Sequence, residues 1–175
     1  MTQFESLANE LLADFFEYLD AVYLLHAFDG LNSRFNTILY RHVRAYHLDL
    51  RRISRQNFDI FCQQRLLSIA DRIVSLHLAD HDETPGLPNL FLYDIFTVSR
   101  IINLRSLSLH DINFVHFVRV LEELHLDHII YLYIRASFNI GEQRHYAYRL
   151  INNIWKLPKL THFKFDTYQS LYGNG

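Results

Sequence analysis

The stretch IVSLHL, residues 73–78, decides the fold because its apolar and polar side chains alternate around Leu76 and Leu78. Alternation with a period of two is typical of a β-strand that buries one face. Similar runs are YHLDL (46–50), LRSLSL (104–109), IIYLYI (129–134) and LTHFKF (160–165), and four of the five follow the template apolar-x-x-apolar-x-apolar. The matching positions lie 25 to 31 residues apart, a spacing that indicates an internal repeat; they are Leu48, Leu76, Leu107, Leu132 and Phe163.

The segments between these runs have the apolar spacing of helices. Residues 54–72 begin with Ser54 as a candidate N-cap and place Phe58, Phe61, Leu66, Ile69 and Ile73 near one face. Residues 92–102, 114–124 and 142–157 have a similar pattern, whereas 79–89 contain two prolines and a glycine and predict an irregular loop. LEELHL, at 121–126, also fits the strand template, but we interpret it as a helix end because that keeps the repeat spacing even. Strand and helix in alternation predict a short, irregular α/β solenoid with a curved sheet of about four to five mostly parallel strands. With a helical N-terminal module, the expected fold class is α+β to α/β.

The first 45 residues predict a separate helical module. A first helix begins near Ala8 and ends near Leu19, Asp20 is a candidate N-cap for a second helix, and Gly30 marks that helix's end. A third helix is expected from residue 31 to about 46. The first helix has an apolar arc of roughly 160°, wider than the stripe of just over about 100° that a helix docked on its own core shows. Its apolar members are Leu11, Leu12, Phe15, Phe16, Tyr18 and Leu19. Either the other two helices cover this arc or a partner protein does, and the small size of the module favours a partner.

Composition and motifs exclude several classes of function. The formal charge is −2 and the pI is near 6.6, which argues against a dedicated nucleic-acid binder. The arginines at 41, 44, 51, 52 and 55 are a candidate site for phosphate or RNA, but Asp49 among them and the overall charge favour a solvated face. The eleven histidines and the single Cys62 show no spacing typical of a metal site, and there is no phosphate-binding glycine loop or nucleophile elbow. We therefore expect neither enzymatic activity nor a cofactor nor a metal.

The start of the chain and its hydropathy predict where the protein resides. Residues 1–10 lack the basic and apolar regions of a signal peptide, and no run approaches the roughly 18 apolar residues that would indicate a membrane span. A lone cysteine fits a reducing compartment. The expected location is the cytoplasm or the nucleus, without membrane attachment.

Residues 4–39 resemble an F-box, and the rest of the chain resembles leucine-rich repeats. The F-box pattern has Leu-Pro-x-Glu-Leu-Leu, then a Phe and a Tyr-Leu pair, then Leu-Leu, and finally a basic-aromatic pair. This chain matches it in order with Leu7, Glu10, Leu11, Leu12, Phe16, Tyr18, Leu19, Leu24, Leu25, Arg34 and Phe35. It departs from the pattern at Ala8, where the family usually has proline, and the repeats lack the regular asparagine of many leucine-rich repeats. The resemblance implies an F-box three-helix module at 1–45 and a repeat solenoid at 46–175, which is either a minimal array or one part of a longer array.

The resemblance also implies a function. Similar proteins are non-catalytic substrate receptors of SCF-type cullin ubiquitin ligases, in which the F-box binds a Skp-type adaptor and the repeats bind a target protein. The residues implied in adaptor binding are Leu7, Ala8, Glu10, Leu11, Leu12, Phe15, Phe16, Leu19 and Leu24. The alternative is a leucine-rich-repeat scaffold or protein-binding module, unrelated to ubiquitin, whose helical head only caps the solenoid.

The strand pattern predicts a second binding surface. If the template positions point inward, as expected for Leu76, Leu78, Leu107, Leu109, Leu132, Ile134, Phe163 and Phe165, the alternate positions line the open, concave face of the sheet. These alternate positions are rich in Tyr, His and Arg, a composition common in protein interfaces. The candidate partner-binding residues are His77, Ser108, His110, Tyr131, Tyr133, Arg135, His162 and Lys164. A solvated sheet face without a ligand remains the other interpretation.

Overall fold

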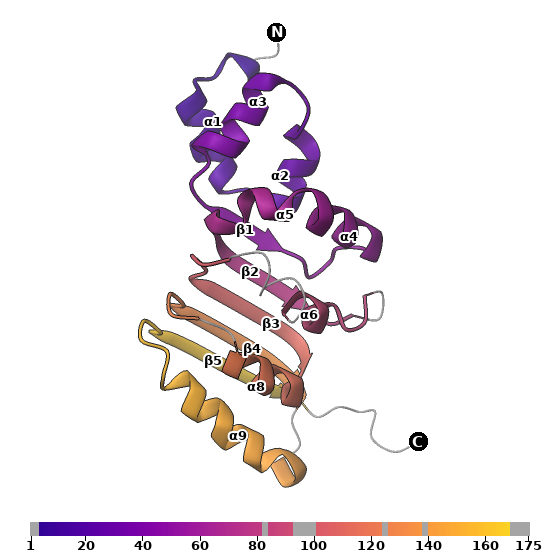
Figure 1. Cartoon of the computed structure of the whole chain (residues 1–175), viewed down its shortest axis with the longest axis vertical. Coiled ribbons are helices and arrows are strands. Elements are labelled where there is room, and N and C mark those ends of the chain that lie inside the picture. The colour runs from indigo at the N-terminus through magenta and orange to yellow at the C-terminus, as the bar shows by residue number, and fades with distance from the viewer. Residues whose placement is uncertain (1–3, 82–83, 93–100, 124–125, 138–139, 169–175) are drawn as a thin grey trace.

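A computed structural model describes residues 4–81, 84–92, 101–123, 126–137 and 140–168 of the chain. It is a mixed α/β structure built on a five-stranded sheet, in which every strand is parallel to its neighbours and the strands follow one another in chain order. Figure 1 shows this sheet running from the helical head at the N-terminal end to the last strand at the other end. The strands are β1 (Tyr46–Asp49), β2 (Ile73–Ala79), β3 (Ser106–Asn113), β4 (Tyr131–Ser137) and β5 (His162–Tyr168).

The register of the sheet confirms the repeat template. Leu48 pairs with Leu76, Leu76 with Leu107, Leu107 with Leu132, and Leu132 with Phe163. The last three strands begin two residues later than the predicted runs, because the first apolar residue of each template lies in the turn before the strand. There Leu104 and Ile129 are buried, so the template marks the core correctly even where it misses the strand boundary.

The helices that follow the strands lie along one face of the sheet (Figure 1). They are α4 (Arg55–Gln64), α5 (Leu66–Ile69), η3 (Ala70–Arg72), α6 (Leu87–Leu90), α8 (Phe114–Glu123) and α9 (Ile140–Ile154). The Ser54 hydroxyl accepts a hydrogen bond from the backbone N–H of Asn57, which confirms the predicted N-cap. The α8 helix ends at Glu123, as expected for residues 121–126, and α6 adds a helical turn to the predicted loop at 79–89. Most of the predicted helix at 92–102 lies outside the described residues.

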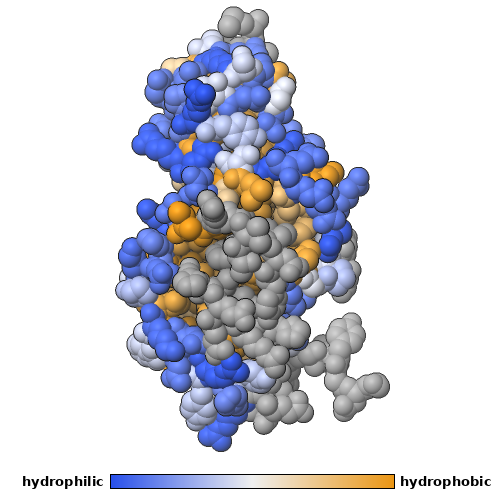
Figure 2. Space-filling view, in the orientation of Figure 1, coloured by the Kyte–Doolittle hydropathy of each residue, from blue (hydrophilic) through white to orange (hydrophobic). Residues whose placement is uncertain are grey.

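The core lies between this helical layer and the sheet. The six inward positions of β2, β3 and β4, from Leu76 to Ile134, are all fully buried, as predicted. The prediction is wrong for Phe163, which is 42% exposed, and Phe165 is only partly buried. Both lie on β5, the last strand of the sheet, where packing comes from one side only. Figure 2 shows hydrophobic side chains gathered across the middle of one face of the molecule, over the helical layer.

The head contains the three predicted helical pieces. After a short turn, η1 (Phe4–Ser6), come α1 (Asn9–Glu17), α2 (Ala21–Phe28), α3 (Ser33–Thr37) and η2 (Ile38–His42). The Asp20 carboxylate accepts hydrogen bonds from the N–H groups of Val22 and Tyr23, so it caps α2 as predicted. Gly30 has φ of +80°, a conformation that favours glycine, and it lies in the turn that follows α2. The expected third helix is split into α3, capped by Asn32, and the π-helical η2.

Phenylalanine side chains fill the core of the head. Phe16 is fully buried, and its ring centre lies 4.8 Å from that of Phe28, 6.3 Å from Phe35 and 6.5 Å from Phe4. Aromatic rings at these distances attract one another in addition to burying apolar area. The α1 helix is therefore anchored through Phe16, which makes its orientation in the head well defined.

Hydrogen bonds from Arg34 fix the backbone just before α1, at the point where the F-box pattern has a proline. Ala8 has φ of −63°, close to the value that a proline ring would impose. The Arg34 guanidinium donates to the backbone carbonyls of Glu5 and Leu7 and, over 2.9 Å, to the Asn9 side chain. These bonds fix the chain on both sides of Ala8, so alanine at this position keeps the backbone geometry that proline would give.

The head and the sheet share one continuous apolar core. Across the boundary, Asp20 accepts a hydrogen bond from the Asp49 N–H at 2.6 Å, and Arg65 pairs with Asp29 at 3.1 Å. Arg72 on η3 donates to the carbonyl of Val43 at the end of the head. The head is therefore firmly attached to the first strand of the sheet. None of the helices in the described ranges is both long and apolar enough to span a bilayer.

Candidate binding surfaces of the head and the sheet

The structure divides the predicted adaptor-binding residues into a core set and a surface set. Leu12, Phe16 and Leu24 are buried inside the head, so in this conformation their side chains are closed to a partner. Leu19 is partly buried against the core. The exposed members are Leu7, Ala8, Glu10, Leu11 and Phe15. The wide apolar arc of α1 is thus covered over one half by the head's own core and left open over the other.

The open half holds Leu11 and Phe15, with Tyr18 at the C-cap of α1 and Leu7 in the bend before the helix also exposed. We call these four residues the α1 stripe. Leu11 is 58% exposed, Phe15 is 48% exposed, and Tyr18 is more exposed still. Residues spaced by three and four positions lie on one side of a helix. The Phe15 ring meets the Phe4 ring edge to face at 6.1 Å, which limits its motion while leaving half of it accessible. The α1 stripe is therefore an ordered apolar surface.

The second surface is the open face of the sheet. The register aligns His77, Ser108, Tyr133 and Lys164 in one row across β2 to β5, and aligns His110 with Arg135 in the next row. Tyr131 and His162 pair with each other one row nearer the start of the strands. All eight predicted residues therefore lie on one face. Tyr131, Arg135, His162 and Lys164 are exposed, and His77, His110 and Tyr133 are partly buried.

Ser108 has a different place from the one predicted. It is only 3% exposed, because its short side chain lies beneath longer neighbours, and its hydroxyl is 3.0 Å from His110 Nε2. Ser108 therefore helps to hold the His110 ring in place through this hydrogen bond. A hydroxyl so enclosed is closed to a protein partner, which removes Ser108 from the set of contact residues.

Hydrogen bonds and ring contacts join the centre of this face into a network. The Tyr133 hydroxyl donates to Asp166 at 2.9 Å, and Lys164 Nζ lies 2.9 Å from the same carboxylate and 4.9 Å from the Tyr133 ring centre. The His110 ring meets Tyr133 edge to face at 4.9 Å. The hydrogen bond from Lys164 lowers the pKa of Asp166. Because these side chains are already held in place, they would lose little further freedom when a partner binds.

The three histidines among the predicted contact residues lie on three different strands. His77 and His110 lie on neighbouring strands, whereas His162 lies on β5. Within the described residues, no three His, Cys, Asp or Glu side chains are placed to hold a metal ion. Burial raises the pKa of Cys62 to about 12, which keeps its thiol protonated.

Stability is expected to decrease as the pH falls below the ordinary histidine pKa of 6.5. Burial lowers the pKa of His77 and His110 in the folded state; Arg51 acts in the same direction and Asp49 opposes it. In the interval between 6.5 and the lowered values, the unfolded chain binds protons that the folded chain does not, so acidification favours unfolding. Urea unfolding at about pH 7.5 and about pH 5.5 should show a larger loss in the wild type than in a His77→Gln/His110→Gln double variant. Equal losses would contradict this assignment.

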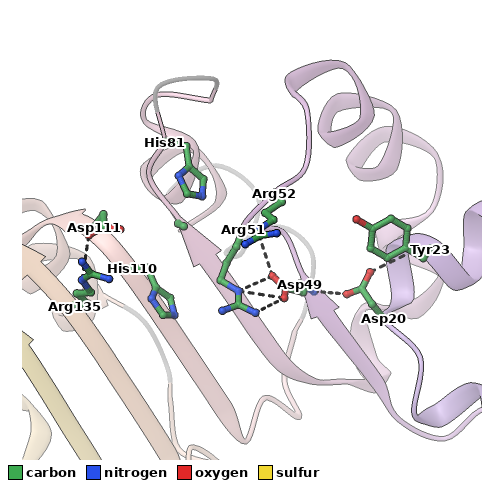
Figure 3. Close-up of a pocket in the computed structure, with 10 residues that line it drawn as sticks. Asp20, Tyr23, Asp49, Arg51, Arg52, His81, His110, Asp111 and Arg135 are labelled. Carbon is green, nitrogen blue, oxygen red and sulfur yellow. Dashed lines mark hydrogen bonds and ion pairs between the residues drawn. The ribbon is translucent and has the colours of Figure 1, made fainter.

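A hollow of about 430 Å³ lies where the head meets the carboxyl ends of the strands (Figure 3). We call it the junction hollow; its lining includes Asp20, Asp49, Arg51, Arg52, Ala79, His81, His110, Asp111 and Arg135. The sequence does not locate this hollow, although phosphate binding is one interpretation of the arginines that include Arg51 and Arg52. The Arg51 side chain lines the hollow, bound to Asp49, and is still 41% exposed. The other four arginines of that set are exposed, as a solvated face predicts. A signal was present in the sequence. Asp49, Asp80 and Asp111 each follow an apolar run, and the carboxyl ends of parallel strands meet at one edge of a sheet.

A bulge in β3 shapes one wall of the hollow. Asp111 has φ of 57°, a rare conformation for a non-glycine residue, and the β3–β4 register shifts between His110 and Ile112. Bulges of this kind redirect a side chain. Here the Asp111 carboxylate pairs with Arg135 Nε at 3.4 Å and accepts a hydrogen bond from the Tyr168 hydroxyl.

No family model, curated protein or solved structure matches this chain. Its function is therefore inferred from the surfaces described above.

Proposed function

We propose that this chain is a substrate-recognition adaptor of an SCF-type cullin ubiquitin ligase. In this proposal the head is an F-box-like module that binds a Skp-type adaptor through the α1 stripe. The parallel sheet is a short leucine-rich-repeat-like solenoid that binds a target protein on its open face. The single observation that carries the proposal is the α1 stripe: an ordered row of apolar side chains left open on a head whose own core is already filled.

The packing of the head supports the docking role of α1. Phe16 and Leu12 hold the inner side of the helix in the core, so Leu11 and Phe15 on the outer side cannot be buried without losing those contacts. Apolar side chains at this spacing are the anchors of helices that bind in a groove of a partner. A module that only caps a repeat array needs a polar outer face, and α1 lacks one along this stripe.

The open face of the sheet supports the target-binding role. Repeat arrays commonly bind partners on this face, and Tyr and Arg side chains are enriched at the energetic centres of protein interfaces. Tyr133 and Arg135 lie on β4, the fourth of the five strands, and are held by Asp166 and Asp111. The chain itself would make or break no bond. Its contribution would be to hold the target beside the ligase, which raises the effective concentration of one for the other.

One observation favours the alternative, a repeat scaffold with a helical cap. The head shares its core with the sheet and is bound to β1 through Asp20 and Asp49, as a cap would be. Both candidates use the same open face for a protein partner. They differ in what the α1 stripe does.

Co-expression with and without a Skp-type adaptor tests the proposed function. The expected result is a stoichiometric complex that survives size-exclusion chromatography, with higher yield of soluble chain than in expression alone. A well-folded chain that stays alone in the presence of the adaptor would reject the adaptor role and favour the scaffold.

A further inference from the structure

We propose that the junction hollow is a binding site for a compact tetrahedral oxyanion, the phosphate group of a phosphate ester or free phosphate. The proposal does not depend on adaptor docking, because the hollow includes none of the α1 stripe. It adds a ligand to one edge of the open face of the sheet, to which His110 and Arg135 belong. It rests on the shape of the hollow and on which of its donors and acceptors are already engaged.

The shape follows from one small residue. The bond from Leu50 N to the His77 carbonyl extends the β1–β2 pairing past Asp49, which brings Arg51 level with Ala79. Ala79 pairs with His110, and His110 with Arg135. Ala79 is the only one of the four without a long side chain, so the row leaves a gap over it. Figure 3 shows Arg51 and His110 directed toward this shared space, with Arg52 and His81 beside it.

The carboxylates around the hollow are engaged in internal hydrogen bonds. Asp20 accepts from three backbone N–H groups, those of Val22, Tyr23 and Asp49. The Asp49 carboxylate accepts from Nε and Nη2 of Arg51 and from its backbone N–H. Asp111 is engaged by Arg135 and by Tyr168, as described above. These acceptors hold the frame of the hollow and are poorly placed to attract a cation.

The arginines, in contrast, keep unused donors. A guanidinium carries five N–H groups, of which Arg51 uses those of Nε and one on Nη2. Arg135 pairs with Asp111 through Nε. Arg52 makes no hydrogen bond or ion pair within the described part of the chain, and it lies at the rim. The junction hollow therefore has a surplus of charge-assisted donors over free acceptors, which suits an anion.

The arrangement favours a tetrahedral anion over a planar one. Arg51 and Arg52 lie in the turn after β1, and Arg135 lies on β4 beyond His110, so the donors come from two opposite sides of the hollow. A carboxylate offers two oxygens in one plane, whereas a phosphate monoester offers three in different directions. The formal charges of the three arginines and three aspartates balance, so the hollow lacks the long-range positive field that polyanions such as nucleic acids require. Selectivity here comes from short contacts.

Nuclear magnetic resonance of the ¹⁵N-labelled chain, in complex with a partner if one is needed for solubility, tests the proposal. Inorganic phosphate titrated at constant ionic strength should shift the amides of Ala79 and His110 saturably, and acetate should bind at least about tenfold more weakly. Arg52→Gln removes no internal contact and should weaken phosphate binding about tenfold, as should Arg135→Gln. The matched control is Arg55→Gln on α4, an exposed arginine paired with Asp59, which should leave binding unchanged.

The proposal is overturned by any of three results: no saturable shift with phosphate, acetate binding as tight as phosphate, or equal weakening by Arg55→Gln and Arg52→Gln. Phenyl phosphate distinguishes the two sources of the ligand. Tighter binding of phenyl phosphate supports a site for an ester-borne group, and tighter binding of inorganic phosphate supports a site for the free anion. Loss of phosphate binding in Arg52→Gln with unchanged adaptor binding separates this site from the proposed function.

Discussion

Phe15→Ala is expected to weaken binding of the chain to a Skp-type adaptor by about 2 kcal/mol or more, roughly 30-fold in affinity. The reason is that half of the Phe15 ring is accessible on the α1 stripe and would be buried in the partner's groove. Its contact with Phe4 holds the ring before binding, so little side-chain freedom is lost on association. The same variant should lower the free energy of unfolding much less than Phe16→Ala does, because Phe15 is half exposed and its ring contacts with Phe4 and Phe16 lie at the surface of the head.

Isothermal titration calorimetry with the purified adaptor measures this effect. Leu11→Ala should give a loss of similar kind, since Leu11 precedes Phe15 by one helical turn on the same stripe. Leu67→Ala is the matched control: Leu67 is 67% exposed but lies on α5, outside the α1 stripe, and its truncation should leave affinity unchanged. Wild-type affinity in both Leu11→Ala and Phe15→Ala, with the fold intact, would reject the α1 stripe as the docking surface.

Phe16→Ala, one position further along the chain, is expected to have the opposite consequence. Phe16 is fully buried among Phe4, Phe28 and Phe35, so truncation leaves a cavity in the middle of the head and should cost about 3–5 kcal/mol of stability. Single domains are stable by only about 5–15 kcal/mol, so the variant should be close to unfolding. Any loss of adaptor binding would then follow from loss of structure.

Urea unfolding followed by circular dichroism measures the stability of both variants. The expected order is wild type close to Phe15→Ala, with Phe16→Ala far below both. Phe16→Leu keeps most of the apolar volume and should fall in between. A Phe16→Ala protein whose unfolding midpoint matches that of Phe15→Ala would show that the two rings do not divide into core and surface as the structure has them.

The register of the sheet could be predicted from the sequence, although the starts of three strands and the exposure of Phe163 could not. Leu48, Leu76, Leu107, Leu132 and Phe163 were aligned by template alone, and the same five residues pair across the five parallel strands. The register is predictable because each strand buries one face. That face is visible in the sequence as an alternation of apolar residues and as a regular spacing between repeats. The caps Ser54 and Asp20 were predictable for a similar reason, since a capping side chain acts on the residues next to it.

The division of α1 into core and surface could not be predicted. Phe15 and Phe16 both fall within the apolar arc, and only the positions of Phe4, Phe28 and Phe35, brought in by other segments, decide which ring is enclosed. The exposure of Phe163 has the same origin, because a period of two describes one strand and says nothing about its neighbours. The junction hollow depends on residues from the head and from four strands, so it appears only when their arrangement in space is known.

The order of the strands has a consequence for how the protein forms. Each strand of the sheet is hydrogen-bonded to the strands just before and after it in the chain, with no long-range crossing. During synthesis, every new strand therefore emerges beside an edge that is already complete, starting from β1 on the head. Paired template positions on neighbouring strands lie 25 to 31 residues apart, so each added strand closes a loop of similar length and similar entropic cost. The sheet can thus grow by successive addition at one edge, in the direction in which the ribosome delivers the chain.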